Sequence, residues 1–353
     1  MKKRKLTSML LVAVLALSLA ACGSNTGSSD SSAVSDADKS TDDGKVYEMV
    51  VSHDEVTDSP QHQAMLALKE YLEKESNGRI KVEIFANGEL GDATDTLEMI
   101  AANTVQGSGF SSDYLSAYDS RLSFLQLPFL FDDYEQVEKL VFDPEGEFHI
   151  MYNDIAKENG FYVLGFQYDG TRNFSNNVRP IETAADMKGL KVRAQQSDMS
   201  VATFEALGCN ATSMAFSEVY TALQQGVVDG QDNPAPLTLA GKFNEVQKYY
   251  STLGHNAGIA VFVTNYEWLQ SLPEDLRELV LYAGEKIGAK QQREAVRANE
   301  QSALEEINAS GCAVNYIEDK SSFVEATKSV YDNYRKIYGD EFMDEVLKAV
   351  GKE

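Results

Sequence analysis

Two arginines occupy positions where an open α/β sheet places its ligands. Arg193 ends the short alternating run Gly189–Arg193, and Arg172 follows closely on the apolar run Phe161–Gln167. Ligands of such sheets bind beyond the carboxyl ends of the strands, and a planar guanidinium offers two parallel donors to a carboxylate. The pair therefore indicates an anion site. The alternative is that each arginine pairs with a surface acid, since the chain has 55 acidic residues.

A second polar pair, His53 and Asp54, directly follows the apolar run Val46–Ser52. A neutral histidine at the rim of a cleft can bond a ligand hydroxyl, although a rim histidine in plain solvent is the alternative. The four histidines include no H-E-x-x-H spacing, so neither a metal ion nor a cofactor is expected.

The elements that position these residues begin at Val46, where strands and helices start to alternate. Ser59 and Pro60 are typical of a helix N-terminus, and the β-α-β-α order argues for an α/β fold with a mostly parallel sheet. Further strands are expected at Phe161–Gln167, Gly189–Arg193, Gly226–Gly230 and Ile259–Thr264, with helices at Asp95–Asn103, Met199–Leu207 and Ser217–Gln225.

The last third of the chain is helical in pattern. Between Pro273 and Asn308 no proline or strand-like run intervenes, which predicts a helix of roughly 35 residues, about 50 Å long. Such a helix either bridges two domains or lies as an arm on the surface. Two shorter helices are expected near Phe323–Tyr334 and Phe342–Val350.

The amino terminus has the pattern of a targeting signal. Residues 1–21 combine four early basic residues with the apolar stretch Met9–Ala21, too short to span a membrane and typical of a secretory signal. The run Leu19–Cys22 resembles the bacterial lipoprotein signal, which implies lipidation of Cys22 and an anchor outside the cytoplasm. An ordinary signal peptide with an incidental cysteine is the alternative. Residues 22–45, rich in Ser and Asp, are expected to form a disordered tether.

The net charge and the two remaining cysteines limit the kinds of partner and site that the chain can have. The formal charge is −24, which repels phosphate backbones and argues against nucleic-acid binding. Cys209 and Cys312 lie in no metal or C-x-x-C spacing. Burial as small hydrophobic residues is expected for both, with a disulfide as the alternative.

A longer pattern resembles a known family. The segment Met214–Pro234 (MAFSEVYTALQQGVVDGQDNP), preceded by Asp186–Arg193 (DMKGLKVR), is similar to the solute-binding subunit of tripartite ATP-independent periplasmic (TRAP) transporters, the DctP family. Shorter matching motifs (GELG at 88–91, LPFLFD at 127–132, GTRN at 170–173 and WLQSLP at 268–273) extend the resemblance over about residues 46–340.

The resemblance implies a fold and a function. The fold is a two-lobed, type II-like periplasmic binding protein with discontinuous domains, mixed sheets and a long helix spanning both lobes. Lobe I is expected to comprise residues 46–169 plus 259–298, and lobe II residues 170–258 plus 299–353. The function is capture of a small organic acid (a C4-dicarboxylate, a sugar acid or a similar carboxylate) in the cleft between the lobes, for delivery to the membrane subunits of a TRAP permease.

The resemblance also assigns roles to residues. Arg193 corresponds to the family's carboxylate-clamping arginine, and Arg172 is expected to assist. Asn233, in a loop-like segment after a strand, is a ligand contact, or otherwise a turn residue before Pro234. Phe216 flanks the ligand, or is a core residue. Ser111 and Ser112 line the first-lobe side, where sialate-binding relatives carry a glutamate that is absent here.

Two other classes of function are alternatives to a binding protein. The first is an exported lipoprotein hydrolase, for which no nucleophile motif, metal set or acid pair at a strand end stands out. The second is a structural or adhesive surface lipoprotein. The sequence favours a binding protein that is not an enzyme.

Overall fold

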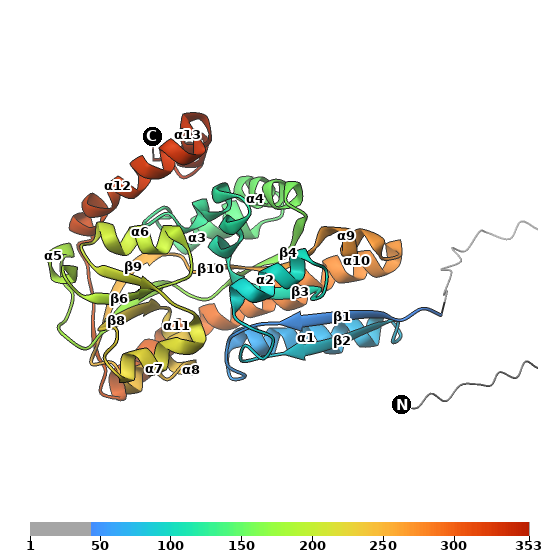
Figure 1. The fold of residues 1–353 in the computed structure, drawn as a ribbon, viewed down its shortest axis with the longest axis horizontal. Coiled ribbons are helices and arrows are strands. Elements are labelled where there is room, and N and C mark those ends of the chain that lie inside the picture. The colour runs from blue at the N-terminus through green and yellow to red at the C-terminus, as the bar shows by residue number, and fades with distance from the viewer. Residues whose placement is uncertain (1–43, 353) are drawn as a thin grey trace, which may run out of the picture. The chain divides into compact units, whose positions relative to one another are not determined.

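The computed structural model describes residues 44–352. The predicted signal peptide, Cys22 and all but the last residues of the predicted tether lie outside the described residues. The described residues belong to one compact unit, built on two mixed sheets with helices packed around them (Figure 1).

The first sheet has five strands in the order β2-β1-β3-β10-β4. β1 pairs in parallel with β2 and β3, whereas β10 runs antiparallel to β3 and β4. The strands are β1 (Tyr47–Ser52), β2 (Ile80–Phe85), β3 (Gly107–Ser111), β4 (Phe161–Tyr168) and β10 (Ile259–Asn265).

The second sheet has six strands in the order β11-β9-β5-β8-β6-β7. β6 pairs in parallel with β7 and β8, and β5 runs antiparallel to β8 and β9. The strands are β5 (Arg172–Asn176), β6 (Lys191–Ala194), β7 (Asn210–Ser213), β8 (Gly230–Asn233), β9 (Tyr249–Asn256) and β11 (Ala313–Asn315).

The chain passes from the first sheet to the second between Tyr168 and Arg172, and it returns between Asn256 and Ile259. We call the half built on the first sheet lobe I and the half built on the second sheet lobe II. The predicted α/β, two-lobed fold with mixed sheets is confirmed. The predicted residue boundaries of the lobes stay a prediction.

Helices cover both sheets, and their starts follow the expected chemistry. Ser59 Oγ accepts a hydrogen bond from His62 N, with Pro60 at the first helical position, which confirms the predicted cap. The helices are α1 (Pro60–Glu75), α2 (Ala93–Ala101), α3 (Tyr134–Val137), α4 (Glu147–Glu158), α5 (Ala184–Met187), α6 (Asp198–Ala206), α7 (Val219–Gln224), α8 (Ala235–Ala240), α9 (Tyr266–Ser271), α10 (Glu274–Ala283), α11 (Gln291–Ala309), α12 (Ser321–Tyr338) and α13 (Asp340–Ala349).

The predicted long helix is present, with a π-helical segment in its middle. α10, the π segment Gly284–Lys290 and α11 follow one another without a break. α11 packs against α1 and β4 of lobe I and against α8 of lobe II, so it bridges the lobes. Gln167 Nε2, from β4, donates to the carbonyl of Gly288 in the π segment at 2.8 Å, which occupies an acceptor inside this irregular turn.

Two details of the strand prediction were wrong. The sheets are mixed rather than mostly parallel, because the short return between β9 and β10 brings β10 back antiparallel to its neighbours. The strand expected at Gly226–Gly230 instead begins at Gly230, so Asn233 is the last residue of β8 and not part of a loop. A Cβ at Gly230 would lie 2.2 Å from the carbonyl oxygen of Ser175, and glycine permits this close approach to β5.

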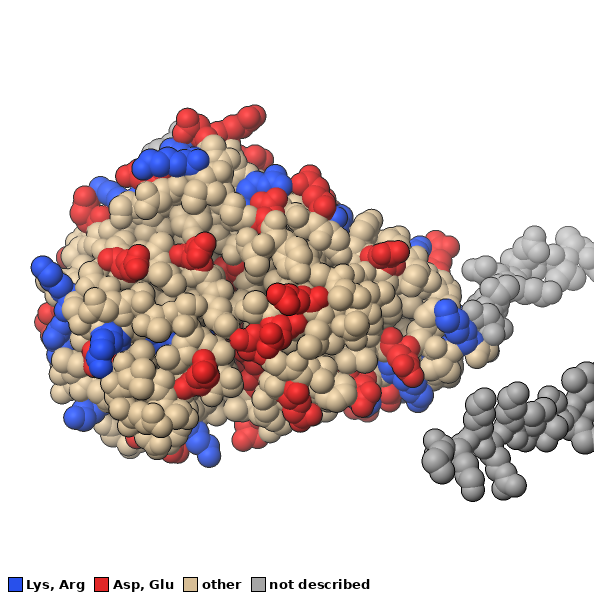
Figure 2. Space-filling model, viewed as in Figure 1, with Lys and Arg blue, Asp and Glu red and all other residues tan. Residues whose placement is uncertain are grey.

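The acidic surface and the burial of the two cysteines agree with what the sequence predicts. Figure 2 shows acidic side chains across the middle of the visible face, with most of the basic ones toward its margin. Cys209 and Cys312 are buried and unbonded, as expected of small hydrophobic residues. Within residues 44–352 no helix is long and apolar enough to cross a membrane.

We predict that Gly165→Ala destabilises the protein, because β4 lies directly against the π segment. The added Cβ would sit 2.6 Å from Ala289 Cβ and 2.9 Å from the carbonyl oxygen of Gly284. Overpacking of this kind costs about 1–3 kcal/mol, which urea denaturation should detect. Gly288→Ala is the matched control, since its Cβ would meet Leu68 Cδ1 at 3.4 Å. Equal stability of the two variants would contradict the close packing.

Candidate functional site

A cavity with about 380 Å³ of empty space, open solvent included, lies where strand ends of both sheets meet. Asp54 and Glu55 follow β1, Ser111 ends β3, Asp169 follows β4, and Asn233 ends β8. Arg193 reaches the cavity from β6. The full lining is Asp54, Glu55, Ala93, Phe110, Ser111, Tyr114, Asp169, Arg172, Arg193, Gln195, Phe216, Asn233 and Leu237.

Arg193 is 1% exposed. Its Nε donates to the carbonyl of Met214 at 3.0 Å, while Nη1 has no hydrogen-bond partner. No carboxylate of the described residues forms an ion pair with it. Burial lowers the pKa of Arg193, but a guanidinium stays protonated in proteins. The cavity therefore contains a buried cation with a free donor.

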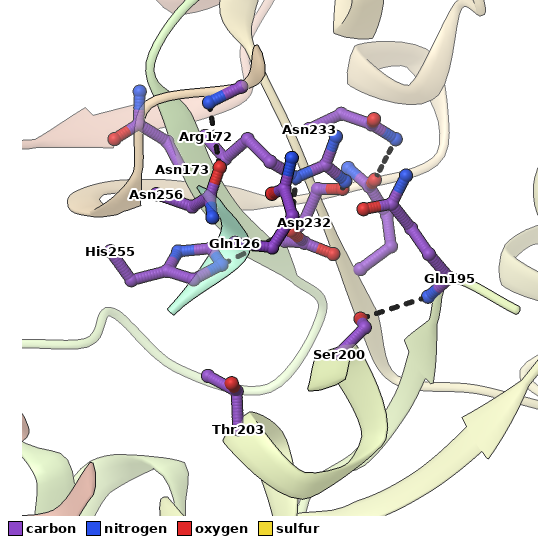
Figure 3. A network of polar contacts seen from close by, with 12 residues as sticks. Gln126, Arg172, Asn173, Gln195, Ser200, Thr203, Asp232, Asn233, His255 and Asn256 are labelled. Atoms are coloured by element: carbon purple, nitrogen blue, oxygen red, sulfur yellow. Dashed lines mark hydrogen bonds and ion pairs between the residues drawn. The ribbon is translucent and has the colours of Figure 1, made fainter. Parts of the chain in front are cut away.

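Arg172 lines the same cavity, but its charge is balanced internally. Its Nε lies 2.6 Å from Asp232 Oδ2, and its Nη2 donates to the Asp232 carbonyl at 2.6 Å. Figure 3 shows His255 on the same carboxylate, with Nε2 at 3.3 Å. Burial by itself would raise the pKa of Asp232, yet Arg172 and His255 outweigh it, and the pKa is lowered. The acid paired with Arg172 is thus a buried one, not a surface one.

Besides Asp54, three more of the predicted residues line the cavity. The side-chain amide of Asn233 donates to Gln231 Oε1, and the backbone carbonyl of Asn233 accepts from the Tyr250 hydroxyl at 2.9 Å. The ring of Phe216 is half-buried and packs edge-on against Phe243, so it is both a cavity wall and part of a small apolar cluster. Ser111 also faces the cavity.

The structure does not bring Ser112 and His53 to the cavity. Ser112 is fully buried, and its Oγ accepts from Gln126 at 2.8 Å. His53 is 1% exposed and pairs with His62 at 3.0 Å, and burial lowers its pKa to about 4. The alternative of a rim histidine in plain solvent is wrong, because His53 is buried against His62 of α1.

Sequence reasoning missed several lining residues. Glu55 and Asp169 follow strand ends as Asp54 does, so the same rule could have found them. Gln195 lies two residues beyond Arg193 and had the same signal. Tyr114, in the turn after β3, carried no such signal.

The three carboxylates of the lining share one electrostatic feature. Burial raises the pKa of Asp54 and of Asp169 to about 6. Burial, and then the charge of Asp169, raise the pKa of Glu55 well above its usual range. Among the described residues none of the three forms an ion pair with a base.

Hydrogen bonds also join the two lobes beside the cavity. Gln196 Nε2, just after β6, donates to Asp92 Oδ2 at 3.0 Å, and Asp92 caps α2 of lobe I. Ser197 Oγ donates to Asp113, also of lobe I. These contacts hold the lobes together around the cavity.

Other hollows differ in chemistry. Two larger ones, of about 650 and 860 Å³, share Thr171, Gly254, Arg297 and Lys320. Neither contains Arg193, and Arg297 is paired with Glu300 at 2.9 Å. Within the described part of the chain no cluster of His, Cys, Asp and Glu could hold a metal ion.

Two lobes joined by two crossings of the chain, with a cavity between their strand ends, define a ligand-binding protein of the two-lobed periplasmic type. The comparisons with known proteins make this class more specific.

The chain matches the family described as bacterial extracellular solute-binding protein, family 7, over residues 51–337. It is 29% identical over 306 residues to the C4-dicarboxylate-binding periplasmic protein DctP of Vibrio cholerae, which covers 86% of this chain and 91% of that protein. The chain therefore belongs to this DctP family, whose members are the binding subunits of TRAP transporters.

Two solved structures are similar over nearly their whole length. The sugar acid binding protein DctPAm from Advenella mimigardefordensis, in complex with galactonate, has 27% identity and a TM-score of 0.82 and covers 87% of this chain and 99% of that chain. A TRAP solute binding protein from Sulfitobacter with bound β-D-galacturonate has 31% identity and a TM-score of 0.81, covering 86% and 100%. The chain is an extracytoplasmic solute-binding protein and not an enzyme.

We predict that Asp232→Asn destabilises the fold by about 3–5 kcal/mol, because it leaves the buried Arg172 without its counter-ion. Chemical denaturation measures the loss. Glu325→Gln is the control, since the Lys328–Glu325 pair is exposed and contributes below about 1 kcal/mol. Similar losses in both variants would show that the buried ion pair carries no special weight.

Proposed function

We propose that this protein captures a small organic acid in the 380 Å³ cavity, with the ligand's carboxylate held by Arg193, and delivers it to the membrane subunits of a TRAP permease. One observation carries the proposal. Arg193 is 1% exposed, has no internal ion pair and lines the cavity with a free Nη1. A buried charge without a counter-ion is costly, and a ligand carboxylate supplies the missing partner.

The neighbouring residues have complementary roles in this proposal. Asn233 can donate to the carboxylate and accept from a hydroxyl, and the ring of Phe216 covers one side of the ligand. Ser111 and Asp54 bond the ligand from lobe I. Arg172 contributes positive potential, although Asp232 balances its charge. Ser112 and His53 support the walls from behind.

The relatives support the ligand class. Their names and structures record a C4-dicarboxylate, galactonate and β-D-galacturonate, which all carry a carboxylate on a small carbon chain. The cross-lobe hydrogen bonds beside the cavity, from Gln196 and Ser197, suit a protein that encloses its ligand before handing it on.

Arg193→Ala should lower the affinity for the acid at least tenfold while the fold stays intact, because the loss of one member of a desolvated charge pair costs about 2–5 kcal/mol. Arg193→Lys should also lose most of the affinity, since lysine keeps the charge but not the two-pronged geometry. Calorimetry on the soluble domain measures both. Affinities within threefold of the wild type would refute the assignment.

We also propose that the mature protein begins at Cys22 and is held at the outer face of the membrane by lipid on that residue. The support is the signal-like sequence of residues 1–22. Several acyl chains together make attachment stable, at about 0.8 kcal/mol for each buried methylene.

Cys22→Ser should remove the anchor, because a hydroxyl cannot replace the thiol in the lipoprotein modification. Cells expressing the variant should show either the uncleaved precursor or a soluble extracytoplasmic form. Mass spectrometry and membrane fractionation distinguish these from the lipidated protein. Unchanged mass and unchanged membrane association would disprove the lipoprotein proposal.

A further inference from the structure

The cavity has an acidic wall on the side of lobe I and the lobe crossing. Asp54 and Glu55 follow β1, and Asp169 stands between β4 and β5. We call these three residues the acidic wall. Arg193 belongs to lobe II, so the cation and at least the Asp54–Glu55 pair come from different lobes.

Three acidic residues and two arginines line the cavity, and they differ in whether a partner within the protein balances their charge. No base of the described residues forms an ion pair with any member of the acidic wall. The positive charge of Arg172 is balanced by its ion pair with Asp232. Arg193 is thus the cation of the lining that is left for a ligand. A ligand with one negative charge is matched by Arg193, whereas a second negative charge has no partner.

We propose that the acidic wall selects a ligand with one carboxylate and several hydroxyl groups, such as an aldonate or a uronate, and rejects a second carboxylate. This inference rests on the proposed function, because it assumes that Arg193 binds the ligand's carboxylate.

Hydrogen-bond chemistry supports the selection. Ionised carboxylates accept strong hydrogen bonds from hydroxyl groups, and like charges repel strongly in a site of low dielectric constant. Burial raises the pKa of Asp54 and Asp169 only to about 6, so both are mostly ionised at neutral pH. Burial raises the pKa of Glu55 well above its usual range, which favours the protonated form of this carboxyl group, a hydrogen-bond donor. A wall with both acceptors and a donor fits hydroxyl groups.

The rest of the lining agrees with a ligand rich in hydroxyl groups. Ser111, Tyr114, Gln195 and Asn233 are spread around the cavity, and each can donate and accept. A ligand with a single ammonium group would form hydrogen bonds with only part of the acidic wall.

Matched ligand pairs test the proposal. D-Galactonate and galactarate, or D-gluconate and glucarate, differ only in whether the far end is a hydroxymethyl group or a carboxylate. D-Galacturonate, succinate and 6-aminohexanoate complete the panel. Calorimetry at pH 7.5 should show at least one aldonate or uronate bound, and each bound aldonate at least tenfold tighter than its matched diacid and than succinate.

The Asp54→Asn variant tests whether the acidic wall causes the preference for an aldonate over its diacid. The amide has the size of the carboxylate without its charge, so the preference for the aldonate over its diacid should fall at least threefold. Asp58→Asn is the matched control, because it makes the same change at an exposed position of the same loop outside the cavity lining. It should leave the preference unchanged.

The outcomes separate this inference from the proposed function. If diacids bind as tightly as aldonates while Arg193→Ala abolishes binding of both, the proposed function stands and the acidic wall does not select. An unchanged preference in Asp54→Asn, or tightest binding of 6-aminohexanoate, also overturns the inference. If no acid of the panel binds, both proposals fail.

Discussion

The unpaired guanidinium of Arg193 is the constraint on which the site depends. An arginine that is 1% exposed and has no internal counter-ion has lost most of its hydration, and such burial is unfavourable unless something compensates. Within the protein, the carbonyl of Met214 satisfies Nε, which fixes the plane of the guanidinium. Nη1 has no partner within the described residues, so it is available to a ligand from outside the chain.

Arg172 shows what the same residue type does when the chain supplies the partner. It comes from β5, which β8 separates from the strand of Arg193, is almost as buried, and is bound by Asp232, which also contacts His255. The contrast gives the two arginines different functions. Arg172 stabilises the junction of β5 and β8, where the lobes cross, whereas Arg193 keeps its charge available to a ligand.

Local patterns in the sequence predicted the elements but not the long-range pairings. The cap at Ser59 and the strand that carries Arg193 near its end rest on neighbouring residues and could be predicted. The Arg172–Asp232 pair joins residues sixty positions apart, and the burial of His53 depends on His62 and α1. Ser112 turns inward because the chain leaves β3 in a tight helical turn. Strand-end position therefore indicated which residues were near the site, and only the packing decided which of them face it.

The division of the cavity between two lobes links ligand binding to the arrangement of the lobes. A ligand held by Arg193 from lobe II reaches Asp54 and Ser111 only when lobe I lies against lobe II. A ligand shifts a conformational equilibrium by its difference in affinity for the two states, so an acid that contacts both lobes favours the closed arrangement. The hydrogen bonds of Gln196 and Ser197 to lobe I form in that same arrangement. Closure then excludes water from the bond between Arg193 and the carboxylate and strengthens it, and the charge that is costly in the closed protein becomes the reason why the ligand is held.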